Sequence, residues 1–148
     1  MREVVLFAIV LLLSIGSVSA EDPGWVPGEL VEQTVGKLVA GMPKGGAATL
    51  RSIEGRFSPA PSSAAQLAIQ IDALTTRLGG PKRFDVVGIQ SVNSSERIFR
   101  VGVLVYHEKA PSFWDLVFFR PGDQWVILEL SFTTEDVLQK AIALAGDG

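Results

Sequence analysis

The sequence contains no cysteine and only one histidine, His107. The absence of cysteine excludes disulfide bonds, thiolate catalysis and a lipid-modified cysteine. A single histidine without cysteine also argues against a zinc site, and we expect neither a metal nor another cofactor. The net charge of −3 argues against nucleic acid as a partner, because nucleic acid requires a concentrated basic face. No motif for a serine nucleophile, a glycosidase carboxylate pair or a nucleotide-binding loop is present.

A second long apolar run is also missing. The first twenty residues, MREVVLFAIVLLLSIGSVSA, have Arg2 near the start, an apolar run from Val4 to Leu13 and small residues before Glu21. This layout is typical of a secretory signal that is cleaved after Ala20. The run is shorter than the roughly 20 apolar residues that a membrane-spanning helix needs, and retention as an N-terminal anchor is the alternative. We therefore expect an exported chain, periplasmic or secreted, with no membrane span after cleavage.

Helical periodicity dominates the first half of the mature chain. Residues 21–27, which hold two prolines and a glycine, are predicted to be a flexible lead-in to a single domain at residues 28–145. Apolar side chains recur at helical spacing from Gly28 to Met42, more weakly from residue 44 to residue 57, and clearly from Leu67 to Leu78.

The ends of the last of these helices carry their own signals. Ser63 with Gln66 matches a capping box at its start. Gly79, Gly80 and Pro81 are expected to end it, because glycine tolerates the backbone of a helix C-cap and proline cannot continue a helix.

Strand periodicity follows. After Pro81 the apolar spacing falls to two over RFDVVGIQSV, RIFRVGVLVYHE and both halves of SFWDLVFFRPGDQWVILELSF, which predicts four strands. NSSE, KAPS and RPGD are the predicted turns. A short C-terminal helix, capped by Thr133 or Thr134, completes the chain. Segregated helices and strands indicate the α+β class, with N-terminal helices packed on a four-stranded antiparallel sheet.

This order of motifs is similar to that of small exported bacterial proteins of the NTF2-like, or cystatin-like, superfamily. The resemblance rests on the helical front, the Gly-Gly-Pro break, the Glu-Lys-x-Pro turn, FWDLVFF and QWVILELSF, and it covers about residues 28–133. It implies a curved sheet wrapped against helices as a cone with a cavity. In enzymes of that superfamily, such as ketosteroid isomerases, an acid in the cavity abstracts protons.

Folding the chain about its turns assigns side chains to two faces of the sheet. Folding about KAPS sets Tyr106 opposite Trp114 and Arg100 opposite Arg120. The face expected to meet the helices is almost wholly apolar: Phe99, Val101, Val103, Val105, His107, Phe113, Asp115, Val117, Phe119, Val126, Leu128, Leu130 and Phe132. The other face mixes aromatics with charge: Arg100, Gly102, Leu104, Tyr106, Trp114, Leu116, Phe118, Arg120, Trp125, Ile127 and Glu129.

Asp115 is the one acid on the predicted apolar face. A carboxylate buried there would have a raised pKa, and with His107 on the same face it forms a candidate acid–base pair. The alternative is that Asp115 accepts hydrogen bonds near the sheet rim, or that a bulge turns it outward. His107 lies beside a turn, where histidines are often only half-exposed.

The mixed face offers a candidate binding surface. Arg100 and Arg120 would repel each other unless an anion or Glu129 lay between them. The neighbouring aromatics Tyr106, Trp114, Phe118 and Trp125 suit an amphipathic molecule. The alternative is two solvated arginines on a twisted sheet edge, which we favour because exposed ion patterns contribute little.

Three functions are consistent with these features. The first is an exported non-catalytic module that binds a small apolar or amphipathic ligand in the cone, or a protein partner across the sheet. The second is a cofactor-free acid–base enzyme, of isomerase or dehydratase type, that uses Asp115 and His107. The third is a structural homodimer packed through the aromatic face without a ligand.

Overall fold

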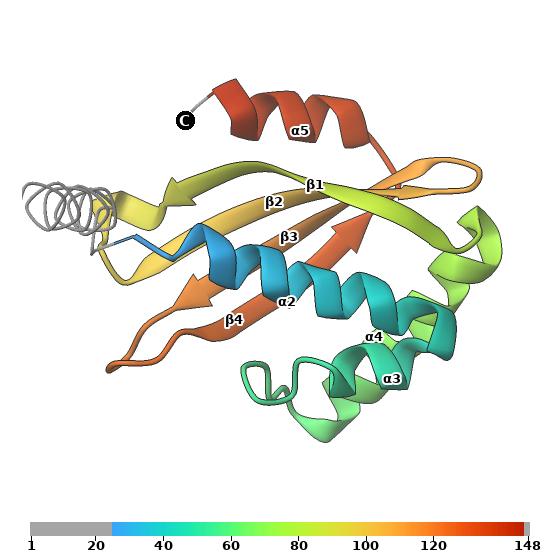
Figure 1. The fold of residues 1–148 in the computed structure, drawn as a ribbon, viewed down its shortest axis with the longest axis horizontal. Coiled ribbons are helices and arrows are strands. Elements are labelled where there is room, and N and C mark those ends of the chain that lie inside the picture. The colour runs from blue at the N-terminus through green and yellow to red at the C-terminus, as the bar shows by residue number, and fades with distance from the viewer. Residues whose placement is uncertain (1–24, 147–148) are drawn as a thin grey trace, which may run out of the picture.

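The computed structural model describes residues 25–146, and Figure 1 shows their arrangement. Four strands form one open, curved antiparallel sheet in the order β1-β2-β3-β4, which confirms the predicted α+β class. The elements are, in chain order, α2 (Gly28–Gly41), the 3-10 turn η1 (Met42–Lys44), α3 (Gly46–Arg51), α4 (Pro61–Leu78), β1 (Pro81–Ser91), the 3-10 turn η2 (Val92–Ser94), β2 (Ile98–His107), β3 (Pro111–Phe119), β4 (Val126–Thr133) and α5 (Val137–Gly146). Among the described residues, no helix is both long enough and apolar enough to cross a bilayer.

Helix α4 begins and ends for different reasons. Its first residue is Pro61, whose fixed φ suits the first helical position. The N-cap is Ala60, which makes no side-chain capping bond, so the predicted capping box of Ser63 and Gln66 is wrong. At the other end Gly79 adopts a φ of 86°, a value that favours glycine, and this confirms the predicted stop.

The main core lies between one face of the sheet and helices α2 and α4; we call this the helix-covered face. Val31, Val35 and Leu38 project from α2, and Ile71 and Leu74 project from α4. The sheet contributes most of its buried side chains to the same cluster: Phe99, Val101, Val103, Val105, Trp114, Leu116, Phe118, Ile127 and Leu130. Burying this apolar surface is the main stabilisation of the fold.

A second, smaller core lies on the opposite, outer face of the sheet, beneath α5. Val137, Ala141 and Leu144 of α5 pack there on Phe113, with Leu104 at the margin. Figure 1 shows α5 across this side of the sheet and α2 across the other.

Glycine permits the close approach of α5. A Cβ on Gly102 would lie 2.1 Å from Cδ2 of Leu144, and a Cβ on Gly88 would lie 2.9 Å from Cγ of the same side chain.

The register of the β2–β3 hairpin differs from the prediction. Tyr106 pairs with Pro111 rather than with Trp114, because Pro111 and Ser112 belong to β3 and the connecting loop is short. Arg100 therefore pairs with Val117 and not with Arg120. A displacement by an odd number of residues turns every side chain of β3 to the other face.

The prediction of which sheet residues meet the helices is therefore right for β2 and wrong for β3. The β2 residues predicted to meet the helices, from Phe99 to His107, are buried as expected. On β3 the prediction is inverted: Trp114, Leu116 and Phe118 enter the main core, while Phe113 joins the second core on the outer face. On β4 a bulge opposite Val117 and Phe118 places Ile127 in the main core and leaves Leu128 58% exposed.

Candidate functional site

Asp115 lies on the outer face of the sheet, paired with Arg100. The guanidinium of Arg100 donates hydrogen bonds from Nε to Oδ1 at 3.0 Å and to Oδ2 at 2.8 Å, and a further one from Nη2 to Oδ2 at 2.5 Å. These bonds raise the pKa of Arg100 above its ordinary value. The predicted placement of Asp115 among the helix-covered residues is therefore wrong, and the carboxylate is occupied by an ion pair.

His107 is separated from Asp115 by the sheet. Its Nδ1 lies 3.0 Å from the carbonyl oxygen of Gly79 and its Nε2 lies 2.8 Å from Oγ of Ser112. Because a carbonyl only accepts, Nδ1 carries the proton and Nε2 accepts from Ser112. Nε1 of Trp114 donates to the same Ser112 oxygen at 2.9 Å. The structure thus gives His107 a set of buried hydrogen-bond partners and does not bring it to Asp115.

Burial shifts the titration of this histidine. Removal from water lowers the pKa of His107 below its ordinary value of 6.5, and the hydrogen bond to Gly79 opposes that shift. Ser112 is fully buried. The arrangement therefore holds the β2–β3 hairpin against the end of α4, and it presents no accessible nucleophile.

The predicted aromatic surface is not assembled on one face. Trp114, Phe118 and Trp125 are 1%, 0% and 7% exposed, so they belong to the core that fills the space between sheet and helices. Tyr106 is half-buried on the outer side, with the guanidinium carbon of Arg83 over its ring at 4.6 Å.

Arg120 lies apart from Arg100. Its guanidinium carbon is 5.2 Å from the centre of the Trp125 ring, and its buried Nε has no hydrogen-bond partner among the described residues. The two arginines predicted to flank an anion are therefore not neighbours.

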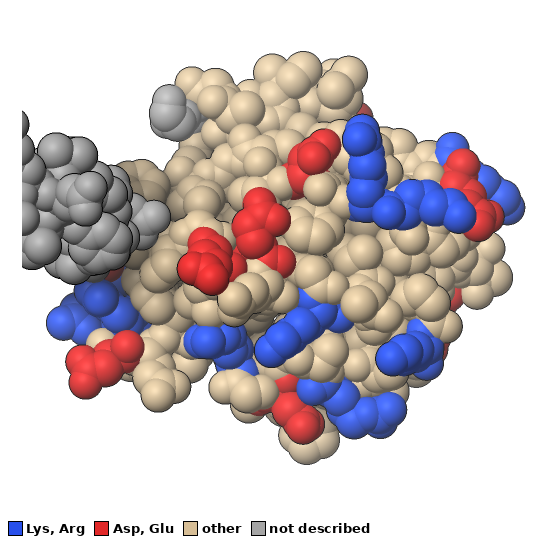
Figure 2. Space-filling model, in the orientation of Figure 1, with Lys and Arg blue, Asp and Glu red and all other residues tan. Residues whose placement is uncertain are grey.

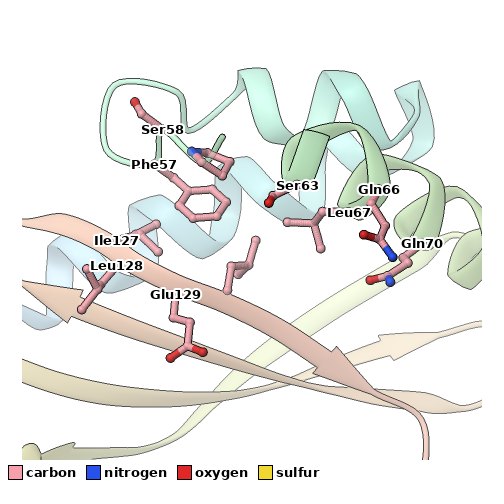
Figure 3. A pocket seen from close by; sticks show the side chains of 11 residues that line it. Phe57, Ser58, Ser63, Gln66, Leu67, Gln70, Ile127, Leu128 and Glu129 are labelled. Carbon is pink, nitrogen blue, oxygen red and sulfur yellow. The ribbon is translucent and has the colours of Figure 1, made fainter. Parts of the chain in front are cut away.

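An open groove runs between α4 and β4; we call it the α4–β4 groove. Its larger part has a volume of about 550 Å³ and is lined by apolar side chains that include Phe57, Leu67, Ile127 and Leu130. Figure 3 shows Leu67, Gln66 and Gln70 on the α4 side and Glu129 directed away from the helices on the strand side.

The groove continues along the strand. An adjoining part of about 430 Å³ shares Gln70 with the first and is lined by residues 132–135 and by Ala73, Leu74 and Arg77 of α4. The two parts together follow β4 from Ile127 to its end. Asp115 and His107 line neither part.

Charged side chains of both signs lie on the surface of the molecule (Figure 2). Figure 2 shows basic and acidic side chains interspersed on the visible face, and uncharged atoms where α5 lies. Glu129 is exposed and forms no ion pair with any residue from 25 to 146. Within that same range, no group of three or more acidic, histidine or cysteine side chains could hold a metal ion.

Comparison with known proteins found no match to this chain, whether among protein-family models, curated proteins or solved structures. The residues of the chain itself therefore carry the functional inference.

Sequence reasoning missed the groove and the buried serine. The sequence offers Glu129 only as a possible counter-ion between Arg100 and Arg120, and nothing in it indicates that α4 lies beside β4. The sequence places Ser112 in the predicted KAPS turn. Its position between His107 and Trp114 was the available signal, because a hydroxyl can serve both side chains at once.

Proposed function

We propose that this chain is an exported, non-catalytic module that binds another protein through the α4–β4 groove. The observation that carries the proposal is the shape and lining of the groove, an open channel that follows β4 from Ile127 to its end and combines apolar side chains such as Leu67 and Leu130 with polar ones such as Gln66 and Gln70. An elongated channel suits a polypeptide segment better than a compact small molecule. Leu128, at 58% exposure, gives a partner an apolar contact at its rim.

A small ligand inside the cone is less favoured. Phe99, Trp114, Leu116 and Phe118 are each at most 1% exposed and fill the space between the sheet and the helices. Small-molecule pockets usually enclose about 300 Å³ or more. The groove offers that volume only as an open surface channel, so we place the partner there and not in the interior.

The acid–base enzyme is the weaker alternative for a geometric reason. General acid–base catalysis needs the two groups within reach of one substrate. Asp115 is ion-paired on the outer face, whereas His107 is buried on the helix-covered face with Ser112. A catalytic function would therefore need a different set of residues.

Export is proposed from residues 1–20, which lie outside the described range. N-terminal sequencing of the chain recovered from the producing cell tests it: the expected first residue is Glu21. A chain that keeps Met1 and stays with the membrane would instead support the anchor alternative. The relation to NTF2-like proteins stays a prediction, with which the cone-like arrangement of sheet and helices is compatible.

Site-specific photo-crosslinking tests the binding function. A photoreactive amino acid at Leu128 samples the groove, and the same amino acid at Leu138 of α5 is a matched control, since these side chains are 58% and 69% exposed. We expect irradiation in the native compartment to give a covalent adduct of protein mass from position 128 only. Equal adducts from both positions, or adducts of small-molecule mass alone, would overturn the proposal.

A further inference from the structure

Strand β4 has an incomplete set of hydrogen bonds. It is the terminal strand of the sheet, and only its beginning is covered on the side away from β3. There the N–H of Ile127 donates to the carbonyl oxygen of Arg56 at 2.8 Å, and the Arg56 guanidinium donates to the carbonyl oxygen of Trp125 at 2.9 Å. Within residues 25–146, the outward backbone groups of Leu128–Phe132 have no hydrogen-bond partner.

This edge is only partly protected against pairing: it has one charge, Glu129, and one bulge, and the segment at Arg56 covers only its first part. Exposed edges are usually blocked by lysine, by proline or by a covering segment. The sequence VILELSFT contains neither lysine nor proline, and the Arg56 segment covers only the first part. The bulge at Val117 and Phe118 leaves Leu128 exposed at the edge instead of hiding it.

Helix α4 gives the open edge a second wall. Ser63, Gln66, Leu67 and Gln70 lie within about two helical turns, along the side of α4 that lines the groove. A strand edge beside a helix is the arrangement in which an extended peptide adds to a sheet: its backbone pairs with the edge and its alternate side chains enter the groove.

We infer that the partner contributes an extended peptide that adds to β4 as a fifth strand. This inference rests on the proposed function and specifies its mode of binding. Every second side chain of the peptide enters the groove; those beside Leu67 and Leu130 are expected to be apolar. The side chains in between lie over the outer face of the sheet, next to Glu129 and Ser131.

Glu129 indicates a cation on the peptide. On the outer face, Glu129 is in register with Val117, which is in register with Arg100. The guanidinium of Arg100 is held by Asp115, and Glu129 has no ion-pair partner among the described residues. Opposite charges directly across a strand pair are favourable, so we expect a lysine or arginine of the peptide to lie beside Glu129.

The same charge disfavours a second copy of this chain as the occupant. A symmetric pairing of two edges through Leu128–Phe132 would centre on Leu130. It would bring the Glu129 carboxylates of both copies onto one outer face, and β4 supplies no cation to offset them.

Selection from a library of random eight-residue peptides on the full chain tests the inference. We expect the selected peptides to alternate apolar and polar residues and to include a lysine or arginine at one polar position. A selected peptide is then synthesised in two forms, N-methylated at the even positions or at the odd positions. Fluorescence polarisation should show that one form loses affinity roughly tenfold or more and the other keeps it, because alternate N–H groups face β4.

Matched variants connect binding to the proposed residues. Glu129→Lys should weaken the selected peptide and favour a peptide with glutamate in place of its cation. Leu128→Glu should weaken binding, whereas Leu138→Glu on α5 should not. Circular dichroism checks that each variant is folded.

The outcomes separate the two proposals. If both N-methylated forms bind as tightly as the parent peptide, strand addition is wrong while groove binding stands. If no peptide is selected, or if binding is unaffected by Leu128→Glu, both proposals are wrong. Sedimentation of the full chain as a dimer that Leu128→Glu dissociates would assign the edge to a second copy and overturn the peptide.

Discussion

Nε2 of His107 accepts a hydrogen bond from Oγ of Ser112 across 2.8 Å, in a site where both residues are buried. Ser112 lies in β3 opposite Val105, so this bond joins the end of β2 to the start of β3. Nδ1 of the same ring binds the carbonyl oxygen of Gly79, which ends α4. One side chain therefore connects the helical layer to the hairpin that sets the register of the sheet.

The stability of the protein should fall in mild acid. The pKa of His107 is lowered from 6.5 in the folded state, so the unfolded state binds the proton more tightly. The stabilisation by neutral His107 is fully present above about pH 6.5 and is lost as the pH falls from there through the folded-state pKa. We expect a lower urea midpoint at about pH 5.5 than at about pH 7.5.

The control for this experiment is His107→Gln. This is the only histidine of the chain, so the variant should be less stable at neutral pH and should lose most of the dependence on pH in this range. If the urea midpoint of His107→Gln depends on pH as strongly as that of the parent protein, the assignment of this dependence to His107 is wrong.

Replacing Ser112 with alanine should be costly for a single hydroxyl. It leaves Nε1 of Trp114 and Nε2 of His107 buried without their partner, and an unsatisfied buried polar group costs about 1–3 kcal/mol. Chemical denaturation of Ser112→Ala measures the loss in the free energy of unfolding. Ser131→Ala, at an exposed position of β4, should change it by less than about 0.5 kcal/mol.

Gly102→Ala should disturb the packing of α5. The added Cβ would lie 2.1 Å from Leu144 and 2.9 Å from the ring of Phe113, and overpacking of this kind typically costs about 1–3 kcal/mol. Combining Gly102→Ala with Leu144→Ala should reduce the loss in the free energy of unfolding that Gly102→Ala causes, because the shorter side chain leaves room for the added Cβ. A double-mutant cycle measures this coupling.

Gly122→Ala is the matched control, since a Cβ there would meet nothing within 4 Å. Strict additivity of Gly102→Ala and Leu144→Ala would contradict the proposed contact.

The Arg100–Asp115 pair should contribute little to stability. The two side chains are 46% and 22% exposed, and solvent-exposed ion pairs typically contribute about 0.2–1 kcal/mol. Asp115→Asn should therefore leave the fold intact with a loss of roughly that size, and salt should reduce the difference between variant and parent. A loss of several kcal/mol would show that the carboxylate has a structural role beyond this pair.

The elements were predictable because their periodicities are local. The helix from Gly28, the stop at Gly79 and the four strands follow from spacing and turn residues alone. The faces of β2 were also predictable, because the alternate residues that point to one face are all apolar: Phe99, Val101, Val103 and Val105.

The faces of β3 were not predictable, because both sets of alternate residues in FWDLVFF contain large apolar side chains. Phe113 and Phe119 compete with Trp114 and Phe118, so the choice depends on where the hairpin turns. The hydrogen bond from Ser112 to Nε2 of His107 joins the two strands in the observed register, and Nε1 of Trp114 donates to the same Ser112 oxygen. In the observed register Asp115 lies on the outer face, so the candidate pair of Asp115 and His107 that the other register predicts does not form.

The separation of the two cores has a consequence for the motions of the chain. Among residues 25–146, helix α5 packs through Val137, Ala141 and Leu144 on the outer face of the sheet and shares no buried cluster with α2 or α4. It can therefore detach as a unit while the opposite layer stays folded. Amide hydrogens of α5 should exchange with solvent at a lower free energy of opening than those of β2, and release of the helix would expose Phe113 and Leu104 to aggregation.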